Sequence, residues 1–219
     1  MNQEIASKLT QIFASLPADD EVSHCVLLFG ALIKDAELAD LALKTSHEHG
    51  LEGTLACEAV LQSFLFAGFP RCINGLESFR RHYGADACLK PTRKEEAKDI
   101  ERFRERGEEL FRKIYGENTE VVMAALDRYH GELKDWILVD AYGKILARPE
   151  LSAKVRELCA VIGLLVSGDT RQLSSHIRGA LHCGAKTNEI DAAIDLVSFL
   201  YSSERQDLAH TLVAKIAKA

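Results

Sequence analysis

Glu157 and His176 are the two side chains of this sequence whose type and setting best suit acid/base chemistry. Glu157 lies in a stretch in which nearly every following residue is apolar, and a carboxylate beside buried surface needs a partner. His176 lies in the next predicted helix near the small residues Gly179 and Ala180, which leave room beside an imidazole. Because an imidazole oriented by a carboxylate is a common acid/base unit, we predict that the two residues form a catalytic pair.

Each member of this pair also has a structural interpretation. An acidic residue such as Glu157 in the first turn of a helix is stabilised by the helix dipole. A histidine such as His176 at the edge of an apolar stripe is often a satisfied core residue. Both interpretations stay open at the level of the sequence.

Three arginines, Arg148, Arg156 and Arg178, surround the pair in the sequence. Guanidinium groups bind carboxylates through two parallel hydrogen bonds, so we predict that these arginines bind a small, multiply anionic organic substrate. The alternative for each is an ordinary surface arginine. We expect no cofactor and no metal site, because the consecutive residues 47–49 (His-Glu-His) lack the spacing of a helical ligand pair.

Three short helices are predicted to position these residues. The first begins after Pro149 and Ser152 and ends at 167–169, and the second covers 173–184. The third is capped by Thr187 or Asn188 and runs to Tyr201. Since short connections make successive helices antiparallel neighbours, we expect residues 150–203 to form a three-helix unit.

A fainter copy of this unit occurs earlier in the chain. An offset of 134 residues places Cys159 on Cys25 and Gly184 on Gly50, with the same succession of helix, turn, helix, glycine and helix. We predict an all-α protein with a degenerate N-terminal repeat (1–83), a helical connector (84–141) and a C-terminal repeat that carries the site (142–219). Few identities support the copy, so chance similarity is the alternative.

The connector is expected to contain two helices. Residues 90–111 alternate charges of both signs, as on a solvated helix face. Residues 121–136 place Val122, Leu126 and Tyr129 on one apolar face.

The composition limits the possible partners. The chain of 219 residues is 47% hydrophobic and carries a net charge of -6, which disfavours nucleic acid and anionic membranes as partners. No apolar run approaches the roughly 20 residues that span a bilayer, and no secretory leader is evident, so we expect a cytoplasmic protein.

Three stretches of the sequence resemble the carboxymuconolactone decarboxylase family, which includes the alkylhydroperoxidase D-type proteins. They are RGEELFRKIYG (106–116), YGKILARPELSAKVREL (142–158) and SGDTRQLSSHIRGALHCGAKTNEI (167–190), and FAGFPRCINGL (66–76) resembles a further family segment. The resemblance implies an alkylhydroperoxidase D-like fold in tandem form. It also implies a homo-oligomer, a trimer or a hexamer.

The sequence departs from the family pattern at several positions. Asp169 and Gln172 stand where the peroxidase branch has its two cysteines, and no C-x-x-C pair occurs anywhere. Without a thiolate a peroxide meets no nucleophile. In the first repeat Ala42 stands at the position of His176, and YSSERQ (201–206) replaces the family's aromatic-x-G-F-P turn.

The sequence therefore predicts a cofactor-free, decarboxylase-like enzyme that acts on a small lactone or carboxylate of aromatic-acid degradation. In this hypothesis Arg148 and Arg178 hold carboxylates, while His176, oriented by Glu157, moves the proton. A non-catalytic member that binds a small acid or a protein is the alternative, and an alkylhydroperoxidase-like antioxidant protein is the third.

Overall fold

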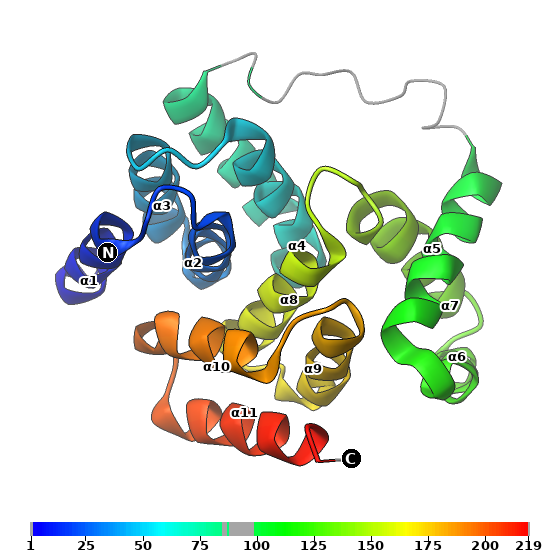
Figure 1. Cartoon of the computed structure of the whole chain (residues 1–219). Coiled ribbons are helices and arrows are strands. Elements are labelled where there is room, and N and C mark those ends of the chain that lie inside the picture. Colours follow the sequence, from blue (N-terminus) through cyan, green and yellow to red (C-terminus); the bar gives the residue numbers. More distant parts are fainter. Residues whose placement is uncertain (1, 85–86, 88–98, 219) are drawn as a thin grey trace.

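The secondary structure is helical throughout the part of the chain that the structure, a computed structural model, describes, namely residues 2–84, 87 and 99–218 (Figure 1). This confirms the all-α prediction. Short turns of 3-10 helix join some of the helices. The longer elements are α1 (Gln3–Ser15), α2 (Glu21–Lys34), α3 (Ala36–Glu48), α4 (Gly53–Tyr83), α5 (Ile100–Tyr115), α6 (Thr119–Tyr129), α7 (Leu133–Trp136), the wide π-helix η3 (Ile137–Leu146), α8 (Ala153–Ser167), α9 (Leu173–His182), α10 (Thr187–Leu196) and α11 (Ser203–Ile216).

Helices α2 and α8 pack against each other at the centre of the molecule. Every residue from His24 to Ile33 in α2 and from Val155 to Val166 in α8 is buried. A helix that is apolar on all sides must be covered on all sides. Helices α3 and α4 cover α2, and α9 and α10 cover α8, so one continuous hydrophobic core joins the two predicted repeats.

The predicted offset of 134 residues relates the two halves in the structure as well. It carries α2, α3 and the start of α4 onto α8, α9 and the start of α10 to within a few residues. Gly50 and Gly184 both follow the second helix of their unit with positive φ, 88° and 94°. This backbone conformation favours glycine because it has no Cβ. The succession of elements agrees with a duplication, which stays a prediction.

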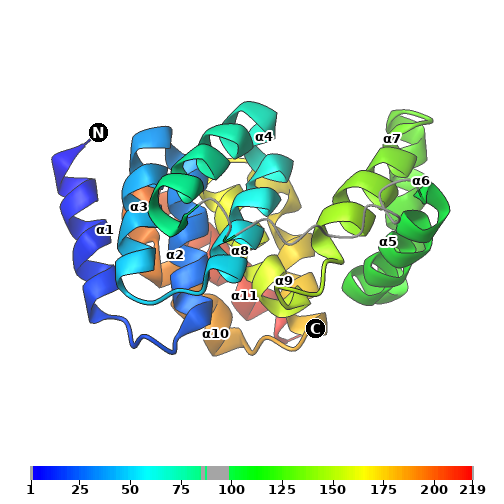
Figure 2. The same cartoon turned by 90° about the horizontal axis from the view of Figure 1, so that it is seen from above.

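The connector forms an arm of its own at the end of the molecule opposite α1 (Figures 1 and 2). It has a small core that includes Phe111, Ile114 and Tyr142. Helices α5 and η3 cross in direct backbone contact at Gly107, where a Cβ would overlap the carbonyl oxygen of Leu138. The predicted boundary between 141 and 142 falls within η3, so the arm continues directly into the C-terminal unit.

Several predicted boundaries differ from the structure. The third helix of the C-terminal unit ends at Leu196, not at Tyr201, and its N-cap is Lys186, whose backbone N–H donates to Glu189 at 2.7 Å. The predicted helix over 121–136 is two helices, because the chain leaves α6 at His130, next to Gly131, in an extended conformation. The first part of the charged segment, 90–98, lies outside the described residues.

Helix α4 bends sharply at Gly68, where φ is 74° and ψ is 175°, just before Pro70. Proline cannot donate a backbone hydrogen bond and glycine tolerates this conformation, so the FAGFP segment builds the bend. The bend lies next to Phe66, whose ring lies edge-on to that of His176 with centroids 6.4 Å apart. In the described residues no helix has both the length and the apolar character needed to cross a bilayer.

Candidate active site

The structure brings Glu157 and His176 together. Nδ1 of His176 lies 2.9 Å from Oε2 of Glu157, so the imidazole N–H donates to the carboxylate. Glu157 is 1% exposed and the side chain of His176 is 13% exposed. The second oxygen of Glu157, Oε1, is buried and has no hydrogen-bond partner among the described residues. The pair is therefore shielded from bulk water, and its carboxylate keeps one unused acceptor.

A glycine on α9 makes this approach between helices possible. A Cβ on Gly179 would stand 2.5 Å from Oε2 of Glu157 and 2.8 Å from Cγ2 of Ile114. Any larger side chain would push the carboxylate or α5 away. Gly179 thus sets the depth at which Glu157 sits between α8, α9 and α5.

The surroundings of the pair come from three parts of the chain. Phe66 of the N-terminal unit lies against His176 and reaches α8 at Gly163. On the arm, the hydroxyl of Tyr142 donates to that of Tyr115 at 3.2 Å. Burial raises the pKa of Tyr142 well above its usual value, and the negative charge of Glu157 adds to this effect. The tyrosines therefore stay protonated and neutral beside the carboxylate.

Two of the three predicted substrate-binding arginines bind a different carboxylate, Glu58 of α4. Arg156 donates to Oε2 of Glu58 at 2.6 Å, and Arg148 donates to Oε1 at 2.6 Å and to Oε2 at 2.8 Å. Gln62, one turn beyond Glu58, donates to the backbone oxygen of Arg156 at 2.8 Å. Glu58 and Arg156 are 3% and 1% exposed. This buried cluster joins the two halves of the chain.

The cluster corrects the role predicted for Arg156. Its guanidinium also donates to the backbone oxygens of Leu151 and Arg148, so its N–H donors are used by protein groups. Burial alone would raise the pKa of Glu58, but the hydrogen bonds from the two arginines outweigh it and lower the pKa. Arg156 is a structural cation, and we do not retain it as a substrate-binding residue.

Arg178 is exposed on α9 and lies two residues after His176. Residues two apart on a helix project from different sides, so Arg178 does not share the face of His176. The structure therefore gathers Glu157 and His176 in one place, Arg148 and Arg156 in a second, and leaves Arg178 outside both.

Three free cysteines of the described residues, Cys25, Cys159 and Cys183, lack the character of redox nucleophiles. Burial raises the pKa of Cys25 to about 12 and that of Cys183 to about 11, and Cys159 is shifted upward by the same cause. A thiol with a raised pKa is a poor nucleophile at neutral pH. Asp169 and Gln172, at the positions of the missing cysteines, are exposed. Among the described residues no group of three His, Cys, Asp or Glu side chains is arranged to hold a metal ion.

The sequence reasoning missed Glu58 and Phe66. Glu58 lies in the apolar run LACEAVL, and the argument that a carboxylate beside buried surface needs a partner applies to it as it does to Glu157. Phe66 carries no such signal, because its place beside His176 depends on the packing of α4 on α8.

Comparison with known proteins agrees with this geometry. Residues 135–209, which contain both Glu157 and His176, match the model of the carboxymuconolactone decarboxylase family. This part of the chain is similar to that family, and the all-α architecture is consistent with an alkylhydroperoxidase D-like fold.

One similar protein is Peroxisomal protein 2 of Schizosaccharomyces pombe. It is 31% identical over 137 residues, which make up 62% of this chain and 63% of the relative. The match thus spans less than two thirds of the relative's length.

Proposed function

We propose that the protein is a cofactor-free, decarboxylase-like enzyme that acts on a small lactone or related carboxylate through Glu157 and His176. The observation that carries this proposal is the buried hydrogen bond of 2.9 Å between His176 Nδ1 and Glu157 Oε2. The carboxylate fixes the imidazole proton on Nδ1, which leaves Nε2 as the atom that exchanges a proton with the substrate.

The proposed reaction breaks the bond between a carboxylate and its neighbouring carbon. Carbon dioxide leaves, the bonding electron pair stays on the carbon, and protonated His176 delivers a proton from Nε2 to that carbon. Solvent then restores the proton on the imidazole. Glu157 stabilises the imidazolium that exists before the transfer, and shielding from water strengthens this interaction.

The absence of a C-x-x-C pair from the sequence supports this reaction over peroxide reduction by the family's dithiol route. Asp169 and Gln172 replace the thiols, and the thiols at Cys25, Cys159 and Cys183 have raised pKa values. Arg148 is occupied by Glu58 and Arg178 is exposed, so a role for either in holding substrate is a separate proposal.

A non-catalytic protein that binds a small acid is the second candidate. It is favoured by the limited exposure of His176, of whose side chain 13% reaches the surface. The two candidates differ in turnover and not in binding.

The test is a panel of lactones and β-keto acids, followed by ultraviolet absorbance with the purified chain. His176→Ala and Glu157→Gln should each lower the rate by a factor of about 100 or more. His210→Ala is the matched control, because His210 pairs with Asp191 and Asp195 away from this pair. If His176→Ala leaves decarboxylation unchanged, the proposed mechanism is wrong, and if no compound turns over, the binding protein is the better description.

The cellular location is a further open point. The cytoplasmic location expected from the sequence stays a prediction, and the name of the relative gives the peroxisome as the other location to examine. Fractionation of cells that express the tagged chain distinguishes them.

A further inference from the structure

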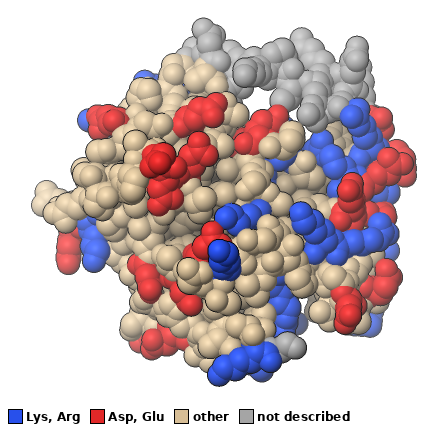
Figure 3. Space-filling view, viewed as in Figure 1, with Lys and Arg blue, Asp and Glu red and all other residues tan. Residues whose placement is uncertain are grey.

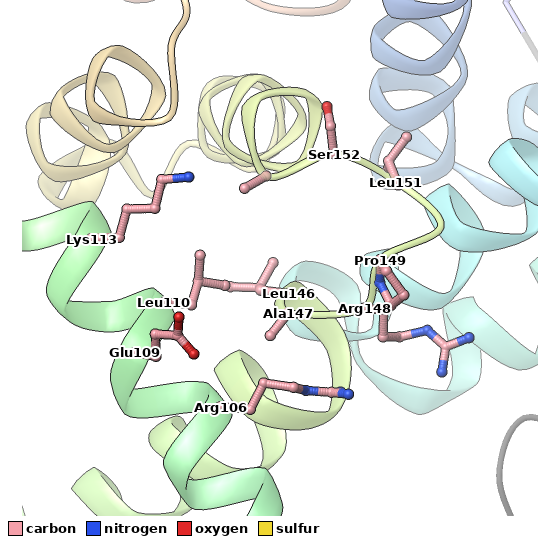
Figure 4. Close-up of a pocket in the computed structure, with 11 residues that line it drawn as sticks. Arg106, Glu109, Leu110, Lys113, Leu146, Ala147, Arg148, Pro149, Leu151 and Ser152 are labelled. Carbon is pink, nitrogen blue, oxygen red and sulfur yellow. The ribbon is translucent and has the colours of Figure 1, made fainter.

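A cavity of about 420 Å³ opens between the arm and the beginning of α8 (Figure 4). Of the residues that the sequence selected, only Arg148 lines it. Its walls come from α5, the end of η3 and the segment that leads into α8. The lining residues are Arg106, Glu109, Leu110, Lys113, Leu146, Ala147, Arg148, Pro149, Leu151, Ser152 and Ala153.

The cavity and the Glu157–His176 pair lie along the same three elements. Each element has one residue in the cavity lining and another, four positions away on the same helical face, that belongs to the pair or lies beside it. These residues are Leu110 and Ile114 on α5, Leu146 and Tyr142 on η3, and Ala153 and Glu157 on α8. Four positions are about one helical turn, or roughly 6 Å along the axis. The cavity is therefore adjacent to the pair.

Lys113 is the cation best placed to meet a ligand. Its side chain points into the cavity toward α8, and it forms no ion pair with any residue that the structure describes (Figure 4). Arg148 contributes less, because its guanidinium points away toward Glu58. Arg106 lies along the opposite edge and donates to the backbone oxygen of Gly143 at 3.0 Å.

Every wall of the cavity contributes to the electrostatic potential around Lys113. Glu109 on α5 is the acidic side chain of the lining, Glu58 is balanced by Arg148 and Arg156, and Glu157 is paired with His176. Helix α8 begins at the cavity with no acidic residue in its first turn, so its unpaired N–H groups add positive potential. Lys and Arg side chains also gather at this end of the surface, among acidic ones (Figure 3). The balance favours an anion.

The rest of the lining is apolar. Leu110 and Leu146 lie between Lys113 and Arg106 (Figure 4), and the segment that leads into α8 adds the apolar residues Pro149, Leu151 and Ala153 to the lining. A volume of this size falls in the range of small-molecule sites, which combine an apolar wall with a few polar anchors. An inorganic anion would leave these apolar walls unused.

We propose that this cavity binds a small organic carboxylate with an apolar body, whose carboxylate pairs with Lys113 and whose body lies on Leu110 and Leu146. The inference deepens the proposed function and rests on it, since the bound carboxylate would be the substrate's. Lys113 thereby takes the substrate-holding role that the sequence assigned to Arg148, Arg156 and Arg178.

Isothermal titration calorimetry with benzoate tests the proposal on the full chain. Lys113→Met should weaken benzoate binding by a factor of about 10 or more, the worth of a charge-assisted hydrogen bond. Lys215→Met, which removes the same charge from exposed α11, is the matched control and should change affinity by less than about twofold. Glu109→Gln should tighten binding about twofold, because it removes the acidic side chain from the lining.

Two further ligands test which chemical class of ligand the cavity binds. Benzyl alcohol lacks the charge and inorganic phosphate lacks the apolar body, so each should bind more weakly than benzoate. The proposal is overturned if benzoate does not bind, if Lys113→Met and Lys215→Met bind it equally, or if phosphate binds as tightly as benzoate. Circular dichroism melting of both lysine variants checks that they fold.

The variant His176→Ala distinguishes the proposed function from the cavity assignment. His176 does not line the cavity, so this variant should bind benzoate as the wild type does while losing turnover. Turnover that survives in His176→Ala contradicts the proposed function, whereas unchanged binding in Lys113→Met contradicts only the cavity assignment.

Discussion

Two buried carboxylates, Glu58 on α4 and Glu157 on α8, are equally hidden from water and differ in their partners. Glu58 receives hydrogen bonds from Arg148 and Arg156 on both oxygens. Glu157 receives one from His176 on Oε2, and Oε1 has no partner among the described residues. Their exposures are 3% and 1%.

The difference separates a structural charge from a reactive one. A buried charge must be compensated, and two guanidinium groups compensate Glu58 permanently because arginine does not lose its proton near neutral pH. A histidine can gain or lose a proton in that range, so the charge balance at Glu157 can change during a reaction. Burial alone therefore does not identify a catalytic carboxylate, whereas the kind of partner does.

The comparison is tested most strongly by replacing each carboxylate with its amide. Glu58→Gln leaves the buried cation of Arg156 without its counter-charge and should lower the free energy of unfolding by about 3–5 kcal/mol. Glu157→Gln loses one charged hydrogen bond and should cost about 1–2 kcal/mol. Urea unfolding of both variants measures the difference, and equal losses would remove the distinction.

Gly179→Ala should disturb Glu157 and leave the Glu58 cluster unchanged. The new Cβ meets Oε2 of Glu157 at 2.5 Å, so we expect a loss of about 1–3 kcal/mol in the free energy of unfolding together with reduced turnover. Gly131→Ala is the control, since a Cβ there meets no atom within 4 Å. If Gly179→Ala keeps wild-type stability and turnover, the close approach of α9 to Glu157 is not needed.

Arg205 binds the C-terminal end of α8, whereas Arg148 and Arg156 lie near its N-terminal end. It lies in the YSSERQ segment, and its Nη1 donates to the backbone oxygens of Leu165 and Val166 at 2.9 and 3.2 Å. Arg205→Ala should cost about 1–2 kcal/mol because the last carbonyls of α8 lose their partner. Arg178→Ala, on the exposed face of α9, should change stability by about 0.5 kcal/mol or less in the same thermal or urea unfolding.

The pH dependence of stability gives the smallest expected effect. The pKa of Glu58 is lowered in the folded chain from its ordinary 4.5. A carboxyl group with a lowered folded pKa stabilises the fold above its unfolded pKa, and this contribution is lost as the pH falls through the folded pKa. Below about pH 5 the free energy of unfolding should therefore fall less steeply in Glu58→Gln than in the wild type. Parallel curves in urea unfolding would contradict the charge state assigned to Glu58.

The local features of the fold could be predicted from the sequence. The apolar pattern of α8 and the glycine after α9 depend on neighbouring residues, and the structure has both near the predicted positions. Helix ends at α10 and α6 were less well predicted, because Lys186 is not a typical N-cap and the break at His130 follows a continuous apolar pattern.

The site could be predicted only in part. The prediction that Glu157 and His176 meet followed from two adjacent helices, and their distance agrees with it. The pairing of Arg148 and Arg156 with Glu58 could not be predicted, because Glu58 lies far away in the sequence and proximity along the chain says little about which charges meet. The sequence also does not tell which side of α5 faces inward, because that depends on the packing of α5 on η3 and α9.

The Glu58 cluster also bears on whether the C-terminal unit can exist as an independent module. Arg148 and Arg156 belong to the family-matched part of the chain, but their counter-charge is supplied by α4. Residues 142–219 transplanted alone would expose to water both Arg156 and the apolar face of α8 that α2 and α4 cover. The N-terminal helices, although they lack a histidine at the position of His176, are thus indispensable to the half that has one.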